Sequence, residues 1–288
     1  MAVSAAMVKE LRERTGLGMM DCKKALAEVD GDMEKAIEEL RKKSSLKAAK
    51  KSGRTTANGL LGVKVAEDGS KAALVEINIE TDFAAKNEKF IAFVSKVADE
   101  LFASADASIE NLAAALNDER ETLVQEIGEN ITIRRGRVMH SATGGISHYM
   151  HGDQCRGALV ELSASSAELG RDLAMHVVAI NPMVINSADV SADILAKERE
   201  IYLSQAQDSG KPEEIIVKMV EGRVKKYLAE VSLLDQPFVK DGNVKVSALV
   251  KEAGVQVQSF LRFEVGEGIE VEELDFAAEV AAQLADSK

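Results

Sequence analysis

The fold of this chain depends on the stretch Asn78-Ile79-Glu80-Thr81-Asp82-Phe83-Ala84-Ala85-Lys86-Asn87. Before it, residues 73–78 alternate with the period of two that is typical of a half-buried strand. After it, apolar residues recur at the spacing of one helical face, namely Phe90, Val94, Val97 and Leu101. The sequence therefore predicts a strand and a helix that meet at a corner holding an acid beside a large aromatic residue.

Two interpretations of this acid and aromatic pair remain open from the local pattern. In the first, Asp82 caps the coming helix and Phe83 packs against it as a hydrophobic staple. In the second, both side chains are presented to a partner. Local pattern alone does not separate a structural role from a binding role.

Residues 81–87 resemble the signature of the bacterial elongation factor Ts family, the nucleotide exchange factors of elongation factor Tu. That signature usually has valine where this chain has Ala84. Residues 8–16, running into 20–26, resemble the family's amino-terminal signature, and 263–268 with 275–280 resemble its carboxyl-terminal region. The resemblance therefore covers nearly the whole chain.

Composition indicates a soluble globular protein with a protein partner. The chain has 288 residues, 46% of them hydrophobic, a net charge of -12 and no Trp, which argues against strong nucleic-acid binding. Two cysteines are too few for a disulfide framework. We see no run of about 20 apolar residues and no signal-peptide pattern, so we expect no membrane span and a cytoplasmic protein.

Residues 1–54 are predicted to form a three-helix bundle followed by a basic tether. Apolar faces define the helices, formed by Val8 and Leu11, by Met19, Cys22, Leu26 and Val29, and by Met33, Ile37 and Leu40. By the family resemblance, this bundle is similar to a ubiquitin-associated fold. Residues 41–54 contain seven Lys or Arg and no acid, which favours a solvated tether. The alternative is an RNA- or ribosome-associated adaptor that uses Arg41 to Arg54.

The remaining pattern predicts an α+β core of two related halves, 55–140 and 141–270. Residues 158–163 repeat the pattern of 73–78 at an offset of 85, and the third strand of the second half is expected at 257–265. An antiparallel helical hairpin is inserted at 187–231. Its expected stripes are Ile194, Glu198, Ile201 and Gln205, and Ile216, Val220, Val224, Tyr227 and Val231. A C-terminal helical module follows at 271–288.

We find no pattern that favours an enzyme, a cofactor or direct nucleotide binding. The glycines near residue 16 do not follow a strand and lack a third member. A metal-ligand set is conceivable in His140, His148, His151, Asp153 and Cys155. His148 and His151 lie three apart in an expected strand, so they would point to opposite faces, and we interpret the set as ordinary surface residues.

The resemblance implies a guanine-nucleotide exchange factor that binds elongation factor Tu in its GDP-bound and nucleotide-free states. In the family, the acid and aromatic pair enters the GTPase domain near the nucleotide and magnesium site. Carried over to this chain, the implied contact segment is Thr81, Asp82, Phe83, Ala84, Ala85, Lys86 and Asn87. Further contact candidates are Met19, Met20, His151, Gly152, Asp275 and Phe276. A homodimer of the binary complex is a further expectation.

Overall fold

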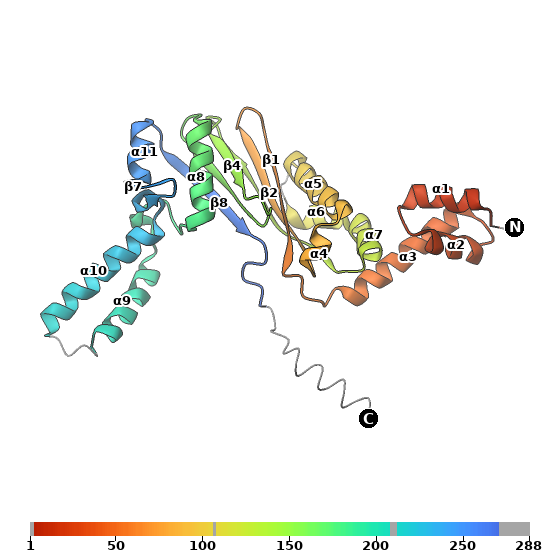
Figure 1. Cartoon of the computed structure of the whole chain (residues 1–288), viewed down its shortest axis with the longest axis horizontal. Helices are drawn as coiled ribbons and strands as arrows, with labels where there is room; N and C mark the ends of the chain where they lie inside the picture. Colours follow the sequence, from red (N-terminus) through yellow and green to blue (C-terminus); the bar gives the residue numbers. More distant parts are fainter. Residues whose placement is uncertain (1–2, 106–107, 208–211, 271–288) are drawn as a thin grey trace, which may run out of the picture.

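Two three-stranded antiparallel sheets form the centre of the protein (Figure 1). The computed structural model describes residues 3–105, 108–207 and 212–270, so the predicted module at 271–288 lies outside the described residues. The first sheet has the order β1-β2-β3, with β1 Asn58–Val65, β2 Lys71–Ile79 and β3 Ile131–His140. The second has the order β4-β5-β8, with β4 Ile146–Met150, β5 Arg156–Leu162 and β8 Val257–Glu264.

Helices cover the outer face of each sheet, and apolar side chains fill the space between the two sheets. On the first sheet lie α4 Asp82–Ala85, α5 Glu88–Ala103, α6 Ile109–Ala115 and α7 Asn117–Ile127. On the second lie α8 Ala167–Ile180 and α11 Val246–Glu252. Short elements complete this half, with 3-10 turns at Ser187–Asp189 and Leu233–Asp235 and the pair β6 Pro237–Phe238 and β7 Asp241–Lys245. The predicted α+β class is confirmed.

Strand β2 is buried on both faces, which corrects the prediction of a half-buried strand. One face, which includes Val75, packs against α5, whose predicted apolar face is buried as expected. On the other face, Leu74 joins Leu159 and Phe263 of the second sheet in a shared core. The alternating pattern predicted that one face of β2 is exposed to solvent. That face is buried because the second sheet covers it.

The two halves repeat the same plan down to an irregularity in the strands. Both run strand, strand, helix and then a third strand that pairs with the second. A β-bulge lies opposite the Glu76–Ile77 step of β2, and another lies opposite the Glu161–Leu162 step of β5, 85 residues later. The extra residues are Arg134 in β3 and Gln258 in β8. The predicted duplication is therefore confirmed at the level of register.

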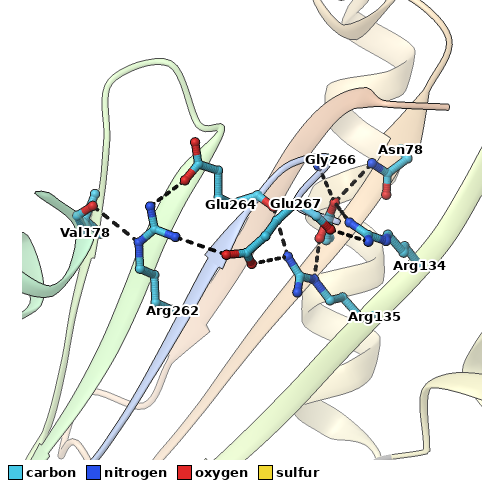
Figure 2. A network of polar contacts seen from close by, with 9 residues as sticks. Asn78, Arg134, Arg135, Val178, Arg262, Glu264, Gly266 and Glu267 are labelled. Carbon is cyan, nitrogen blue, oxygen red and sulfur yellow. Dashed lines mark hydrogen bonds and ion pairs between the residues drawn. The ribbon is translucent and has the colours of Figure 1, made fainter. Parts of the chain in front are cut away.

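The first bulge directs two arginines at one buried carboxylate (Figure 2). Neighbouring strand residues normally point to opposite faces, but the extra residue at the bulge lets Arg134 and Arg135 both reach Glu76, at 2.9 and 2.5 Å. Glu76 also accepts hydrogen bonds from the Gly266 N–H at 2.8 Å and the Asn78 amide at 3.0 Å. Burial raises the pKa of Glu76, but these donors outweigh it, so the pKa lies below its usual value.

The same cluster ties the end of β8 to the first sheet (Figure 2). Arg135 also pairs with Glu267 at 3.1 Å, and its guanidinium lies 4.4 Å from the ring centroid of Phe263. Arg262 reaches Glu264 at 2.5 Å. The segment that follows β8 is therefore held against β2 and β3 by these contacts.

The N-terminal residues form the predicted three-helix bundle at one end of the molecule, with α1 Ala5–Thr15, α2 Met19–Glu28 and α3 Met33–Lys51 (Figure 1). Ser4 caps α1 and Asp32 caps α3 through side-chain hydrogen bonds. Val8, Leu11, Cys22, Leu26 and Leu40 are buried as expected. Met19, expected on the inner face of α2, is instead exposed.

The basic stretch 41–54 is not the predicted tether, because α3 continues through it to Lys51 and packs on α7. Ser44 and Ala48, four residues apart, provide the buried face of this part of the helix. Lys51 donates to the Gly128 carbonyl, and Arg41 pairs with Asp118 of α7. The pattern of this short buried face is difficult to recognise in the sequence because most of the neighbouring residues are lysine or arginine. The bundle is therefore attached to the core by a continuous helix.

The predicted helical hairpin is present at the opposite end, with α9 Ala192–Gln207 and α10 Glu213–Val231 (Figure 1). From α10, Val220 and Val224 are buried as predicted. From α9, the packed residues are Leu195, Tyr202 and Ala206, and Ile201 of the predicted stripe is exposed. None of the described helices is long and apolar enough to cross a membrane.

We predict that Glu76→Ala lowers the free energy of unfolding by about 3 kcal/mol near neutral pH, since four donors lose their buried acceptor. Because folding lowers the pKa of Glu76, its contribution is present above the usual pKa of 4.5 and is lost as the pH falls through the folded value. The difference from the unmodified protein should therefore shrink in acid. Urea unfolding followed by circular dichroism, near neutral pH and in acid, measures the two differences in the free energy of unfolding.

The matched control is Glu67→Ala, because Glu67 is exposed between β1 and β2 and should lose almost no stability. Equal losses in the two variants, or a loss at position 76 that does not depend on pH, would contradict the account of the buried carboxylate.

Candidate functional site

The predicted corner forms the short helix α4 between two helix caps. The Thr81 hydroxyl accepts a hydrogen bond from the Ala84 N–H at 3.2 Å and so caps α4. The Asn87 side chain accepts one from the Lys89 N–H at 2.9 Å and caps α5. Asp82 occupies the first position inside α4. The prediction that Asp82 is the cap is therefore wrong, because the residue before it already supplies the capping oxygen.

The side chain of Phe83 projects into solvent, with 81% of its surface exposed. The Lys86 ammonium lies 5.4 Å from the ring centroid and pairs with Asp82 at 3.0 Å. A staple would be packed against the following helix, so the staple interpretation is wrong. A single exposed apolar side chain is not unusual by itself. What distinguishes Phe83 is its place on an element whose backbone is held at both ends.

Two small residues attach α4 to the core. Ala85 is buried in the core of the first half, and Ala84 packs against it. Their short side chains let α4 lie directly on β1 and β2. The inner side of the corner is therefore packed, while its outer side carries Asp82, Phe83 and Lys86.

Two carboxylates hold the backbone from which α4 begins. Glu129, between α7 and β3, accepts a hydrogen bond from the Thr81 N–H at 2.9 Å and another from the Thr81 hydroxyl at 2.8 Å. In return, Glu80 accepts one from the Asn130 N–H at 2.6 Å. We call these four residues the clasp: Glu80, Thr81, Glu129 and Asn130. The clasp joins the end of β2 to the start of β3 at the base of the corner.

The clasp also reaches the end of α3. The Arg54 guanidinium lies 3.3 Å from the Glu80 carboxylate. The Asn130 amide donates to the carbonyls of Ser52, at 3.4 Å, and Arg54, at 3.1 Å. The helix that carries the bundle is thereby attached to the corner.

Met19 and Met20 begin α2 and are 55% and 65% exposed. The loop before them is held beside α5, because the Lys89 ammonium lies 3.3 Å from the Gly16 carbonyl and 2.7 Å from the Glu126 carboxylate. A cleft of about 560 Å³ lies here between the bundle and helices α5 and α7. The loop before the two methionines therefore contacts Lys89, which lies directly after the corner.

His151 and Gly152 lie in the turn after β4 and not in the expected strand. His151 Nδ1 lies 2.9 Å from the Asp153 carboxylate, which Arg156 also contacts at 3.0 Å. Burial raises the pKa of Asp153, but hydrogen bonds from the Cys155 N–H, His151 and Arg156 outweigh it and lower the pKa to about 2. The turn is therefore held in shape by a carboxylate that remains charged at neutral pH.

The strand register brings this turn and the corner to the same end of the two sheets. The end of β2 pairs with the start of β1, where the Asn58 amide donates to the Glu80 carbonyl at 2.8 Å. The turn after β4 contacts the same strand, since the Leu61 N–H donates to the Gln154 carbonyl at 2.8 Å. The end of β8 is also here, with the Val265 N–H bonded to the Cys155 carbonyl at 2.8 Å. Asp275 and Phe276 lie outside the described residues.

Sequence reasoning missed the carboxylates of the clasp. Gly128, with a left-handed φ of 87°, ends α7 and marks a turn before β3. Nothing in a single sequence indicates that the next residue, Glu129, contacts Thr81, 48 positions earlier. Within the described ranges, no group of three or more His, Cys, Asp or Glu is arranged to hold a metal ion.

Comparison with known proteins identifies the family. The family model described as "Elongation factor TS" matches residues 80–267, which include the corner and the clasp. The chain belongs to the elongation factor Ts family. Proteins named Elongation factor Ts from Hahella chejuensis and Saccharophagus degradans are 56% and 55% identical to it, over 98% and 100% of this chain and 99% and 100% of theirs. One from Teredinibacter turnerae is 53% identical over 100% of this chain and 99% of its own. Family membership places the chain among the translation elongation factors.

We predict that Phe83→Ala changes the free energy of unfolding by less than about 0.5 kcal/mol, because the ring is exposed and its removal leaves no cavity in the core. The matched control is Phe90→Ala on α5, where a fully buried ring is lost and the expected cost is about 3–5 kcal/mol. Denaturant unfolding of both variants measures the two values. A loss of more than about 1.5 kcal/mol at position 83 would restore the staple interpretation.

Proposed function

We propose that this chain is the guanine-nucleotide exchange factor of elongation factor Tu, and that Asp82 and Phe83 promote the release of GDP. The observation that carries the proposal is the exposed Phe83 ring on a corner that is capped, packed from below and clasped at its base. A side chain that enters another protein must be accessible beforehand, and binding costs less free energy when its backbone is already ordered.

No bond is made or broken in this function. An exchange factor binds the nucleotide-free partner more tightly than the GDP-bound partner, and reciprocity of binding free energies requires it to weaken GDP binding by the same factor. The residues of the corner therefore act through a complex of the chain, the partner and GDP that loses GDP quickly. This mechanism needs a shaped contact surface and no cofactor.

The two side chains at the corner supply different contacts. The Phe83 ring is the apolar part and fits insertion between helices of the GTPase domain, where it displaces packed groups near the nucleotide. The Asp82 carboxylate, held beside the ring by Lys86, adds a negative charge near the magnesium environment. Ala84, Ala85 and the Asn87 cap maintain the short helix beneath them.

We propose that the other contact candidates belong to the same docking surface. His151 and Gly152 lie at the same sheet end as the corner, and Met19 and Met20 are exposed on the attached bundle. We assign Asp275 and Phe276 to a further contact by the family resemblance alone. The helical hairpin lies at the end of the molecule opposite the bundle (Figure 1). We therefore propose a peripheral role for it, such as a contact in a homodimer of the binary complex.

The alternative of an RNA- or ribosome-associated adaptor receives less support from the geometry. Several cations of residues 41–54 pair within the chain, among them Arg41 with Asp118, Lys43 with Glu28 and Arg54 with Glu80. Cations that already have carboxylate partners bind phosphates less readily, and the stretch is packed on α7 along one face.

We predict that Phe83→Ala slows the release of GDP from elongation factor Tu by about ten- to a hundredfold, because burying a Phe ring stabilises a complex by roughly 1.5–3 kcal/mol. Asp82→Ala should slow release in the same direction, by a smaller factor. The measurement is the fluorescence of labelled GDP after mixing with excess exchange factor.

The matched control is Leu46→Ala on α3, because Leu46 is 64% exposed and lies outside the corner. Release with this variant should equal release with the unmodified chain. If GDP release with Phe83→Ala equals release with the unmodified chain, or if Leu46→Ala slows release as much as Phe83→Ala does, the proposed role of the corner is wrong.

A further inference from the structure

We infer that Glu129 is a positioning residue for GDP release, acting on the partner only through the orientation of α4. This inference rests on the proposed function, because it explains how the Asp82 and Phe83 tip is held ready for insertion. Glu129 is half-buried and lies at the base of the corner, and its contacts to the corner are with Thr81. Its role is therefore distinct from that of the presented side chains.

Helix α4 needs support from outside itself. It has four residues, and a helix this short does not form alone because its nucleation costs more than its few hydrogen bonds return. Phe83, at 81% exposure, contributes no packing that would fix the helix from its own ring. The direction in which the ring points is therefore set by the two ends of α4.

The two ends are held in different ways. At the C-terminal end, Ala85 is buried, and the Lys86 and Asn87 N–H groups bond to the carbonyls of Phe83 and Ala84, at 3.2 and 3.0 Å. At the N-terminal end, no comparable apolar anchor is present among the corner residues, because Thr81 is half-buried and Asp82 is exposed. That end is fixed by polar contacts instead.

Glu129 provides the main polar contact there. One carboxylate binds both the backbone N–H and the hydroxyl of Thr81, so it fixes the backbone and the rotamer of the capping side chain together. That rotamer is the one in which the hydroxyl accepts from the Ala84 N–H. Removal of the carboxylate should leave the sheet and the Ala85 anchor in place but release the first turn of α4.

Two substitutions at this position separate positioning from charge. Glu129→Ala removes both acceptors. Glu129→Gln can keep both contacts, because the amide oxygen accepts from the Thr81 N–H while the amide nitrogen donates to the Thr81 hydroxyl oxygen, which can accept in place of donating. We therefore expect the glutamine variant to behave as the unmodified chain does.

The experiment measures labelled-GDP release in a double-mutant cycle with Phe83→Ala, together with amide hydrogen exchange at Thr81 and Ala84 in the free chain. Glu129→Ala should slow release about tenfold, and Glu129→Gln less than about twofold. In the Phe83→Ala background, Glu129→Ala should slow release further by no more than the smaller factor expected for Asp82→Ala, because most of its effect acts through the Phe83 contact. The two amides should exchange faster in Glu129→Ala without a lower melting temperature.

Several outcomes would overturn the inference. Unchanged amide exchange in Glu129→Ala would show that the carboxylate does not hold the corner, and equal slowing in both Phe83 backgrounds would show that it acts elsewhere. If Glu129→Ala fails to fold, Thr81→Val removes the hydroxyl contacts alone and enters the same cycle, with the same expected pattern. If the unmodified chain does not accelerate release, the proposed function fails, and the amide exchange separately decides whether Glu129 orders α4.

Discussion

The packing of the two sheets against each other is the constraint on which the rest of the structure depends. Leu74 of β2 meets Leu159 and Phe263 of the second sheet, so β2 is covered by a sheet on one face and by α5 on the other. A strand buried on both faces cannot leave a carboxylate unpaired, because an isolated buried charge is strongly destabilising. Glu76 is accordingly surrounded by Arg134 and three other donors, and these same contacts fix the end of β8.

The corner takes its properties from this double burial. Strand β2 is held firmly to its last residue, and the clasp at Glu80 and Thr81 extends that order to the start of α4. Five residues after Asp82 the chain is fixed again by the Asn87 cap of α5. The exposed ring of Phe83 therefore stands on an ordered backbone, and such order lowers the entropic cost of the insertion that we propose.

Local periodicity was sufficient to predict β2, the apolar face of α5, the bundle helices and the repeat at residues 158–163, since each follows from side chains near one another in sequence. The sequence could not show the burial of Glu76, because the sheet that covers it comes from the other half. It could not show the packing of Ser44, because the stretch 41–54 that contains this small residue has seven Lys or Arg and reads as a solvent-exposed segment. The partner of Thr81, Glu129, lies 48 positions away, and the exposure of Phe83 follows from tertiary packing.

The central claim is that Phe83 enters the GTPase domain of elongation factor Tu, and site-specific photo-crosslinking tests it most directly. A photoreactive phenylalanine analogue replaces Phe83 in one protein and Leu46, which is similarly exposed, in another. The account predicts a strong crosslink from position 83 to the GTPase domain in the nucleotide-free complex, and little from position 46. A complex that forms normally but gives no crosslink from position 83, or equal crosslinks from both positions, would contradict it.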